Sequence, residues 1–311
     1  MEVLYQLLLG SMLVLLALAS GQGRNEQIVL RATQVVALAL GLRCLVHYLQ
    51  LDPTAMAGAW WTTALVLLLL CLFTGATVFS SGWRGWLELR LQAGDAAFRS
   101  ASPRHVTALV LMPVVVACTL VLSAESGSPG NPFDLDVVFM STLLLLLFAF
   151  LGVGFPLRRT WQQACERLNL LVPAPRVLLL AVGVGILLVS LVSILWLLWV
   201  LVAWPMYAEN DGSLVNPGLA TAVLSAAMTA LGEETMFRGL LQPVFGVALT
   251  SVCFALLHMR PGSEIAFLPV LGVSLTLGWL RWRHGTVAAI VAHFCYNLTL
   301  GLTSAWYGAQ V

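Results

Sequence analysis

The feature of this sequence that most constrains its fold is a series of long apolar runs, which recurs along the whole chain. A helix that crosses a membrane needs about 20 consecutive, mostly apolar residues. About ten segments approach or reach this length. They are residues 3–20, 28–48, 55–79, 106–123, 137–154, 177–204, 217–241, 244–258, 265–281 and 285–303. Because the segment 244–258 is short, we expect about eight to ten spans.

The composition of these runs indicates helices rather than strands. A transmembrane barrel needs strands with alternating apolar and polar residues, whereas these runs are continuously apolar. Only 9% of the 311 residues are charged, compared with about 25% in a typical soluble domain. The predicted fold class is therefore all-α, a polytopic transmembrane helical bundle with membrane lipid as a partner. The net charge of +1 gives no reason to expect a nucleic-acid partner.

Arginine residues gather in alternate loops. Residues 80–105, 155–176 and 281–284 hold most of them, and loops rich in arginine usually face the cytoplasm. The first of these loops contains GWRGWLELRLQ, in which tryptophan and leucine stand beside arginine. This stretch is typical of a short helix at the membrane surface, although a plain solvated loop fits it equally. The composition is rich in alanine and leucine and contains arginine but no lysine. It leans towards a bacterial chain, so we expect a multi-pass protein of the bacterial inner membrane.

Ionisable residues within the predicted spans gather in the C-terminal part of the chain. These residues are Glu233, Glu234, Arg238, His258 and His293. A charge inside a bilayer costs about 2.5–3.5 kcal/mol, so we expect these groups to face one another across a polar cavity with a function. We place a boundary near the stretch LVPAPR. Residues 1–176 would form an N-terminal bundle of unknown role, and residues 177–311 the functional domain.

The first motif that can carry chemistry is GEETMFRG, residues 232–239. On a helix Glu234 and Arg238 are four residues apart, so they share a face and can form an ion pair. Glu233 is rotated from Glu234 by about 100°. A second carboxylate in an apolar cavity can serve as a general base. The alternative is that all three residues form an ion network that only stabilises the packing.

Two further motifs follow, FALLH at residues 254–258 and HFCYN at residues 293–297. Phe254 and His258 share a helical face, as do His293 and Asn297. His293 and Asn297 both offer N–H donors, and two fixed donors can stabilise an oxyanion. The alternatives are that His258 is an interfacial residue at the end of a span and that His293 and Asn297 make hydrogen bonds between helices.

Together the three motifs resemble those of a known family. An acid, a histidine and a His/Asn donor pair are the parts that activate a water and stabilise a tetrahedral intermediate. GEETMFRG, FALLH and HFCYN are similar to the motifs E-E-x-x-x-R, F-x-x-x-H and H-x-x-x-N of the CAAX-protease and bacteriocin-processing family of intramembrane glutamic proteases, which includes abortive-infection-like members. The resemblance covers about residues 177–305. It implies an all-helical membrane bundle with a site in a cavity open to the cytosol.

The resemblance also implies roles for individual residues. Glu233 would be the general base, helped by His258, while His293 and Asn297 would form the oxyanion hole. The supporting residues would be Glu234, Arg238 and Phe254. The expected activity is that of an intramembrane endopeptidase, a hydrolase that cleaves a membrane-associated protein or peptide tail, possibly a lipidated one. No cofactor is expected.

Two other hypotheses remain open. Glu233, His258 and His293 could ligate zinc in a metal-dependent membrane protease, although the helical zinc-protease motif H-E-x-x-H is absent from the sequence. Alternatively, the chain could be a non-catalytic scaffold, sensor or immunity protein, or a transporter, because buried charges also mark ion paths.

Overall fold

The computed structural model describes residues 24–51, 60–91, 98–126, 133–156, 158–203, 218–259 and 266–308. Within these ranges the regular secondary structure is entirely helical, which confirms the predicted all-α class. The predicted span 3–20 lies outside the described residues.

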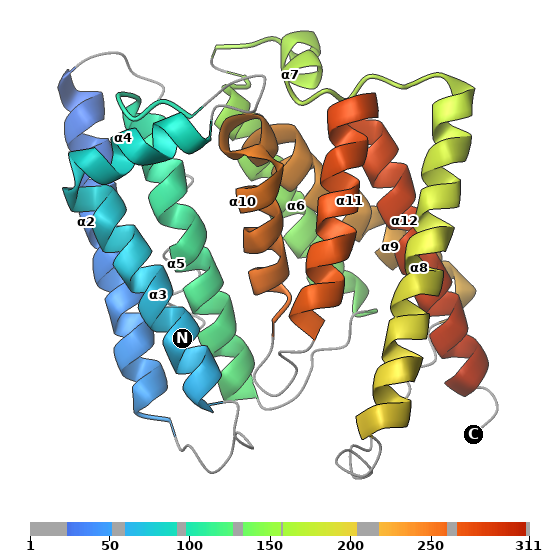
Figure 1. Cartoon of the computed structure of the whole chain (residues 1–311). Helices are drawn as coiled ribbons and strands as arrows, with labels where there is room; N and C mark the ends of the chain where they lie inside the picture. Colours follow the sequence, from blue (N-terminus) through green and yellow to red (C-terminus); the bar gives the residue numbers. More distant parts are fainter. Residues whose placement is uncertain are drawn as a thin grey trace. The chain divides into compact units, whose positions relative to one another are not determined.

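Figure 1 shows the helices in their order along the chain. The first part of the chain forms α2 (Arg24–Leu49), α3 (Trp60–Phe79), α4 (Ser81–Arg90), α5 (Pro103–Ser126), α6 (Leu135–Val153) and α7 (Trp161–Arg167). The second part forms α8 (Pro175–Ala203), α9 (Leu219–Glu234), the π-helix η3 (Thr235–Leu241), α10 (Gln242–Leu257), α11 (Phe267–His284) and α12 (Thr286–Gly308).

Seven helical stretches of the described chain are long and apolar enough to cross a membrane. They are Gln27–Leu49, Trp60–Phe79, Pro103–Leu122, Leu135–Val153, Pro175–Leu195, Leu219–Leu257 and Thr286–Thr303. The stretch Leu219–Leu257 has 39 residues and takes in two predicted spans, 217–241 and 244–258. The predicted span 265–281 falls on α11. The chain is thus an integral, multi-pass membrane protein, as its apolar runs indicate.

The chain divides into two compact units that are discontinuous in sequence. The first unit comprises Met1–Pro129, Gly154–Thr160 and Leu241–Ser274. The second unit comprises Gly130–Val153, Trp161–Leu240 and Leu275–Val311. The predicted division at residue 176 concerned function, and it stays a prediction.

In the first unit α2, α3 and α5 pack against one another, and α10 packs against α5. Their shared core is apolar and includes the fully buried side chains of Tyr48, Leu67 and Leu120. Several neutral polar groups in this interior bond locally or in pairs. The Gln34 amide, for example, donates to the Thr107 hydroxyl of α5 at 2.9 Å. Such neutral bonds tie α2 to α5 without burying a charge.

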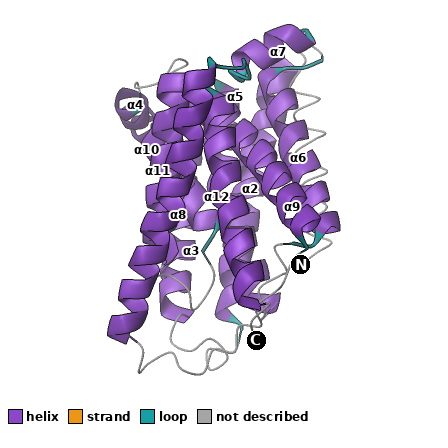
Figure 2. Ribbon diagram, turned by 90° about the vertical axis from the view of Figure 1, so that its right-hand side faces the viewer, coloured by secondary structure: helices purple, strands orange, loops and turns teal. Residues whose placement is uncertain are grey.

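In the second unit α12 packs against both α8 and α9, and α9 also packs against α6 (Figure 2). Glycines allow the closest approaches. A Cβ atom placed on Gly185 of α8 would lie only 2.8 Å from the Cβ of Cys295 on α12, and one on Gly232 of α9 would lie 3.1 Å from the Thr142 Cα of α6. Small residues at helix contacts are the usual means of close packing in membranes. They allow α12 to pack closely against α8, and α9 to pack closely against α6.

The connection between α7 and α8 fixes the start of α12. The Thr286 hydroxyl donates to the Leu168 carbonyl at 2.6 Å, and the Thr286 N–H donates to the Asn169 carbonyl at 3.1 Å. Leu168 is fully buried, and its carbonyl would lie 3.1 Å from a Cβ on Gly239 of η3. This one connection therefore contacts both η3, which carries Arg238, and α12, which carries His293.

Candidate active site

The motif GEETMFRG lies where α9 gives way to the π-helix η3. Helix α9 ends at Glu234, and η3 begins at Thr235. The sequence analysis treated this stretch as regular α-helix, and the structure differs. A π-helix bonds each N–H to the carbonyl five residues earlier, which widens the turn, and such segments are frequent at functional sites. The widened turn stands directly beside the two glutamates.

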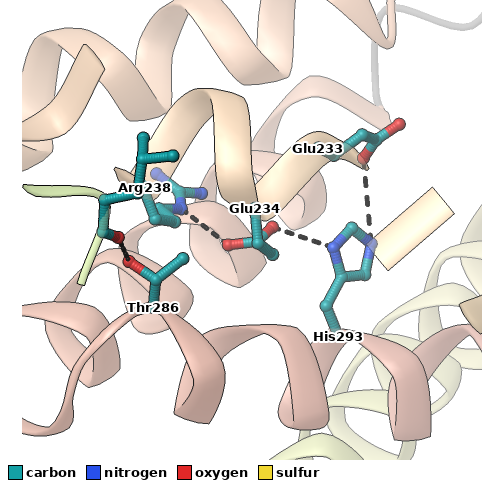
Figure 3. A network of polar contacts seen from close by, with 6 residues as sticks. Glu233, Glu234, Arg238, Thr286 and His293 are labelled. Carbon is teal, nitrogen blue, oxygen red and sulfur yellow. Dashed lines mark hydrogen bonds and ion pairs between the residues drawn. The ribbon is translucent and has the colours of Figure 1, made fainter. Parts of the chain in front are cut away.

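Glu234 is at the centre of a buried polar network (Figure 3). Its Oε2 accepts a hydrogen bond from Arg238 Nε at 3.0 Å, so the predicted ion pair is present. Its Oε1 is 2.8 Å from His293 Nδ1. Glu234 and Arg238 are both fully buried, and an isolated charge would be strongly destabilising there. The opposite charges of Glu234 and Arg238 offset each other. Both carboxylate oxygens have a partner, Arg238 for Oε2 and His293 for Oε1.

His293 lies between the two glutamates. Its Nδ1 contacts Glu234 as described, and its Nε2 is 3.9 Å from Glu233 Oε2. An ionised carboxylate can only accept a hydrogen bond, so Nδ1 is the nitrogen that donates to Glu234. A histidine fixed in this way has a defined ring orientation and directs Nε2 towards Glu233.

Glu233 differs from Glu234 in its exposure. The side chain of Glu233 is 18% exposed, whereas that of Glu234 is 0% exposed. The two adjacent carboxylates therefore have separate environments, one enclosed by Arg238 and His293 and the other reachable from outside. Of the two side chains, that of Glu233 is the more accessible.

Asn297 follows His293 by one turn on α12, so the two side chains share a helical face. Asn297 is half-buried. The Tyr296 ring has its centroid 6.4 Å from that of His293. The predicted pairing of His293 and Asn297 as oxyanion donors stays a prediction.

His258 and Phe254 belong to the first unit. His258 is exposed and stands at the C-terminal end of α10. Its ring stacks on Phe254 with centroids 4.4 Å apart, and its Nδ1 is 2.8 Å from the Phe254 carbonyl. Because a carbonyl only accepts, Nδ1 donates and the acceptor lone pair is on Nε2. The predicted shared face of this pair is thus present, while the cooperation of His258 with Glu233 stays a prediction.

Several contacts that shape this site could not be predicted from the three motifs. The motif HFCYN pairs His293 with Asn297, whereas in the structure the His293 Nδ1 binds Glu234. Thr286 and Gly239, which contact Leu168 from α12 and η3, lie outside the predicted set of site residues. A possible signal was the pair Gly285-Thr286 at the start of α12, since Gly285 has a φ of 93° that favours glycine.

The part of the chain that the structure describes contains no group of three or more His, Cys, Asp or Glu side chains arranged to hold a metal ion. Zinc ligation by Glu233, His258 and His293 remains a hypothesis.

The observed arrangement has a clear chemical capacity. An accessible carboxylate faces one nitrogen of a histidine, and a buried carboxylate and guanidinium fix the other nitrogen. A base that is oriented by a third group is the common design of sites that move protons. The network can therefore accept a proton at Glu233 and present an oriented imidazole next to it.

Comparison with known proteins finds a family match in this part of the chain. Residues 214–299 match the family described as type II CAAX prenyl endopeptidase Rce1-like. The matched range contains all the residues predicted for the site. They are Glu233, Glu234, Arg238, Phe254, His258, His293 and Asn297.

A curated relative is an uncharacterized protein, YpbD, of Bacillus subtilis strain 168. It is 29% identical over 98 residues, which are 29% of this chain and 52% of the relative. The matched part of the chain thus spans about half the length of that relative. No solved structure matches the chain. The match of residues 214–299 to the Rce1-like family confirms the resemblance seen in the three motifs.

Proposed function

We propose that this chain is an intramembrane endopeptidase of the glutamic type, in which Glu233 activates the attacking water. The observation that carries the proposal is the arrangement of the two adjacent glutamates within the matched domain. Glu234 is enclosed by Arg238 and His293, while Glu233 is partly exposed beside the same histidine.

Glu233 suits the role of base because of its position. Its Oε2 is 3.9 Å from His293 Nε2, which leaves it near the imidazole without enclosing it. In the proposed reaction, the Glu233 carboxylate takes a proton from water, and the hydroxide formed adds to the scissile carbonyl carbon. Glu233 then returns the proton to the departing amine as the C–N bond breaks. His258 would assist this transfer.

His293 and Asn297 would stabilise the tetrahedral oxyanion. In its doubly protonated form the imidazole donates from both nitrogens, to Glu234 through Nδ1 and to the oxyanion through Nε2. Glu234 and Arg238 would act through His293 as positioning residues. Their complete burial supports this division of labour, since neither can reach a substrate directly.

The proposed substrate is the tail of a membrane-associated protein or peptide, with or without a lipid group, cut at the cytoplasmic side of a bacterial inner membrane. The family description supports an endopeptidase. The position of the network on helices that are long and apolar enough to cross a membrane supports a substrate that reaches it from the membrane.

The first test is cleavage of labelled tail peptides, with and without a prenyl group, by the full chain and by its Glu233→Gln variant in detergent. We expect the variant to lose at least about a hundredfold in rate, as loss of a general base does. A matched control is Glu166→Gln, which changes an exposed acid of α7 that contacts Gln162. The control should cleave at the normal rate, and both variants should keep the normal unfolding midpoint.

A chelator arm separates the proposal from the zinc hypothesis. Activity that resists chelator and is lost in Glu233→Gln supports the glutamate mechanism. Activity that chelator removes and zinc restores would replace it with the metal mechanism. Full activity in a well-folded Glu233→Gln variant would refute Glu233 as the base. Absence of cleavage by the folded wild-type chain across a broad peptide library would favour the scaffold or sensor hypothesis.

A further inference from the structure

Helix α4 begins where the membrane-spanning helix α3 ends. Only Ser80 separates Phe79 from Ser81, and the Ser80 hydroxyl accepts a hydrogen bond from the Trp83 N–H at 3.1 Å. Figure 1 shows α4 running across the direction of α3 at one end of the first unit. A helix that turns aside directly after a span lies at the level of the membrane surface. The structure thus confirms a helix in the stretch GWRGWLELRLQ.

Arginine and tryptophan side chains fix the angle between the two helices. The Arg84 guanidinium donates to the carbonyls of Thr77 and Val78 at 2.9 and 3.0 Å. These carbonyls belong to the last turn of α3, where no partner exists within the helix. Trp83 Nε1 donates to the Thr77 hydroxyl at 3.2 Å. Since Arg84 is engaged in this contact, other arginines must supply any charge offered to a ligand.

The outer face of α4 combines an apolar surface with a cation. Leu87 is 5% exposed and points into the unit, whereas Trp86 is 48% and Leu89 is 71% exposed. Trp86 stacks on Trp83 with centroids 5.1 Å apart, and the Arg90 guanidinium lies 5.6 Å from the Trp86 ring centre. Exposed tryptophan with neighbouring arginine is typical of the lipid headgroup region.

A further arginine lies next to α4. The Glu88 carboxylate accepts hydrogen bonds from the N–H and hydroxyl of Ser100, which brings the exposed Arg99 next to α4. Arg90, in the last turn of α4, is also exposed. Two exposed arginines therefore accompany the exposed Trp86 and Leu89 side chains.

We propose that α4, with Arg90 and Arg99, forms a binding site for the headgroup of an anionic phospholipid. Guanidinium groups bind phosphate oxygens through paired hydrogen bonds. Trp86 and Leu89 lie against the first part of the acyl chains. The exposed Trp86 and Leu89 side chains distinguish this site from one for free phosphate, because a soluble anion makes no apolar contacts. The proposal concerns the first unit and does not depend on the proteolytic activity.

The test is native mass spectrometry of the full chain in detergent, titrated with phosphatidylglycerol and with phosphatidylcholine. We expect the wild type to bind phosphatidylglycerol in preference. The double variant Arg90→Gln/Arg99→Gln should weaken phosphatidylglycerol binding by at least about tenfold and leave phosphatidylcholine binding unchanged. The matched control Arg176→Gln/Arg283→Gln changes two exposed arginines of the second unit and should retain the preference.

Two further arms complete the test. Trp86→Ala should weaken the binding of both lipids, because it removes apolar contact area that both would use. Excess inorganic phosphate should not displace phosphatidylglycerol from the wild-type chain. Equal binding of the two lipids, an unchanged preference in a folded Arg90→Gln/Arg99→Gln variant, or displacement by phosphate would each overturn the proposal.

Discussion

The two units bury polar groups in different ways. In the first unit the buried polar side chains of the described residues are neutral, such as Gln34 and Thr107. In the second unit, buried charged or titratable side chains accompany the neutral ones. They are Glu234, Arg238, Arg281 and His293. In the first unit the buried polar groups serve packing alone. The second unit buries charged groups at a cost in free energy, and packing alone does not require them. The difference indicates where function is concentrated.

The largest difference between the units should appear when one member of a buried pair is removed. Arg238→Leu leaves the Glu234 carboxylate in a dry interior without its guanidinium partner. We expect a loss of about 3–5 kcal/mol in the free energy of unfolding and no detectable cleavage. Chemical unfolding in detergent, followed by circular dichroism, measures the first quantity.

The control for this variant is Arg283→Leu in the same unit. Arg283 is exposed, and its guanidinium lies 5.7 Å from the Trp282 ring centre. Its removal should cost less than about 1 kcal/mol. Equal losses in the two arginine variants would contradict the idea that burial makes the Glu234–Arg238 pair critical.

A smaller effect is expected at the contact of α8 with α12. Gly185→Ala forces the Ala292 backbone away, because the new methyl group has no room there. We expect a cost of about 1–3 kcal/mol, together with lower cleavage, since Ala292 precedes His293. Gly183→Ala in the same helix meets nothing within 4 Å and should be neutral or slightly stabilising. Thermal unfolding midpoints of the two variants make the comparison directly.

Sequence alone predicted the parts of the molecule that depend on local spacing. The helices follow from the apolar runs, and the Glu234–Arg238 pair follows from a separation of four residues on a helix. It could not predict the bond from His293 to Glu234, because that contact joins residues 59 positions apart and depends on how α9 and α12 pack. The π-helix likewise has no simple sequence signal.

In the first unit, a single substitution should have a milder effect. Gln34→Leu removes the donor to Thr107, whose hydroxyl also donates to the Pro103 carbonyl at 2.8 Å. Because Thr107 retains a partner, we expect a loss of about 1 kcal/mol and normal cleavage. The double variant Gln34→Leu/Thr107→Val should be close to the wild type, since both polar partners are removed together. A loss as large as that of Arg238→Leu would remove the contrast between the units.

The smallest effect concerns an exposed group. Hydrogen bonds from the Ser100 hydroxyl and N–H lower the pKa of Glu88 below its ordinary value. Since the folded-state pKa is the lower one, this contribution to stability is present above the pKa of the unfolded chain and is lost as pH falls through that of the folded chain. The difference in unfolding midpoint between wild type and Glu88→Gln should therefore shrink on acidification. A difference that is constant with pH would show that Glu88 acts through packing only.

The unequal exposure within the polar network has a consequence for hydrogen exchange. The Glu233 side chain is 18% exposed, while Glu234 and Arg238 enclose the other side of the His293 ring. A proton at Nε2 should therefore exchange with water faster than the proton shared with Glu234, which must wait for the helices to open. In deuterated buffer the Nδ1 proton signal of His293 should persist long after the Nε2 proton signal of the same ring has disappeared. The two nitrogens of one ring would then report on local access and on the opening of the bundle, respectively.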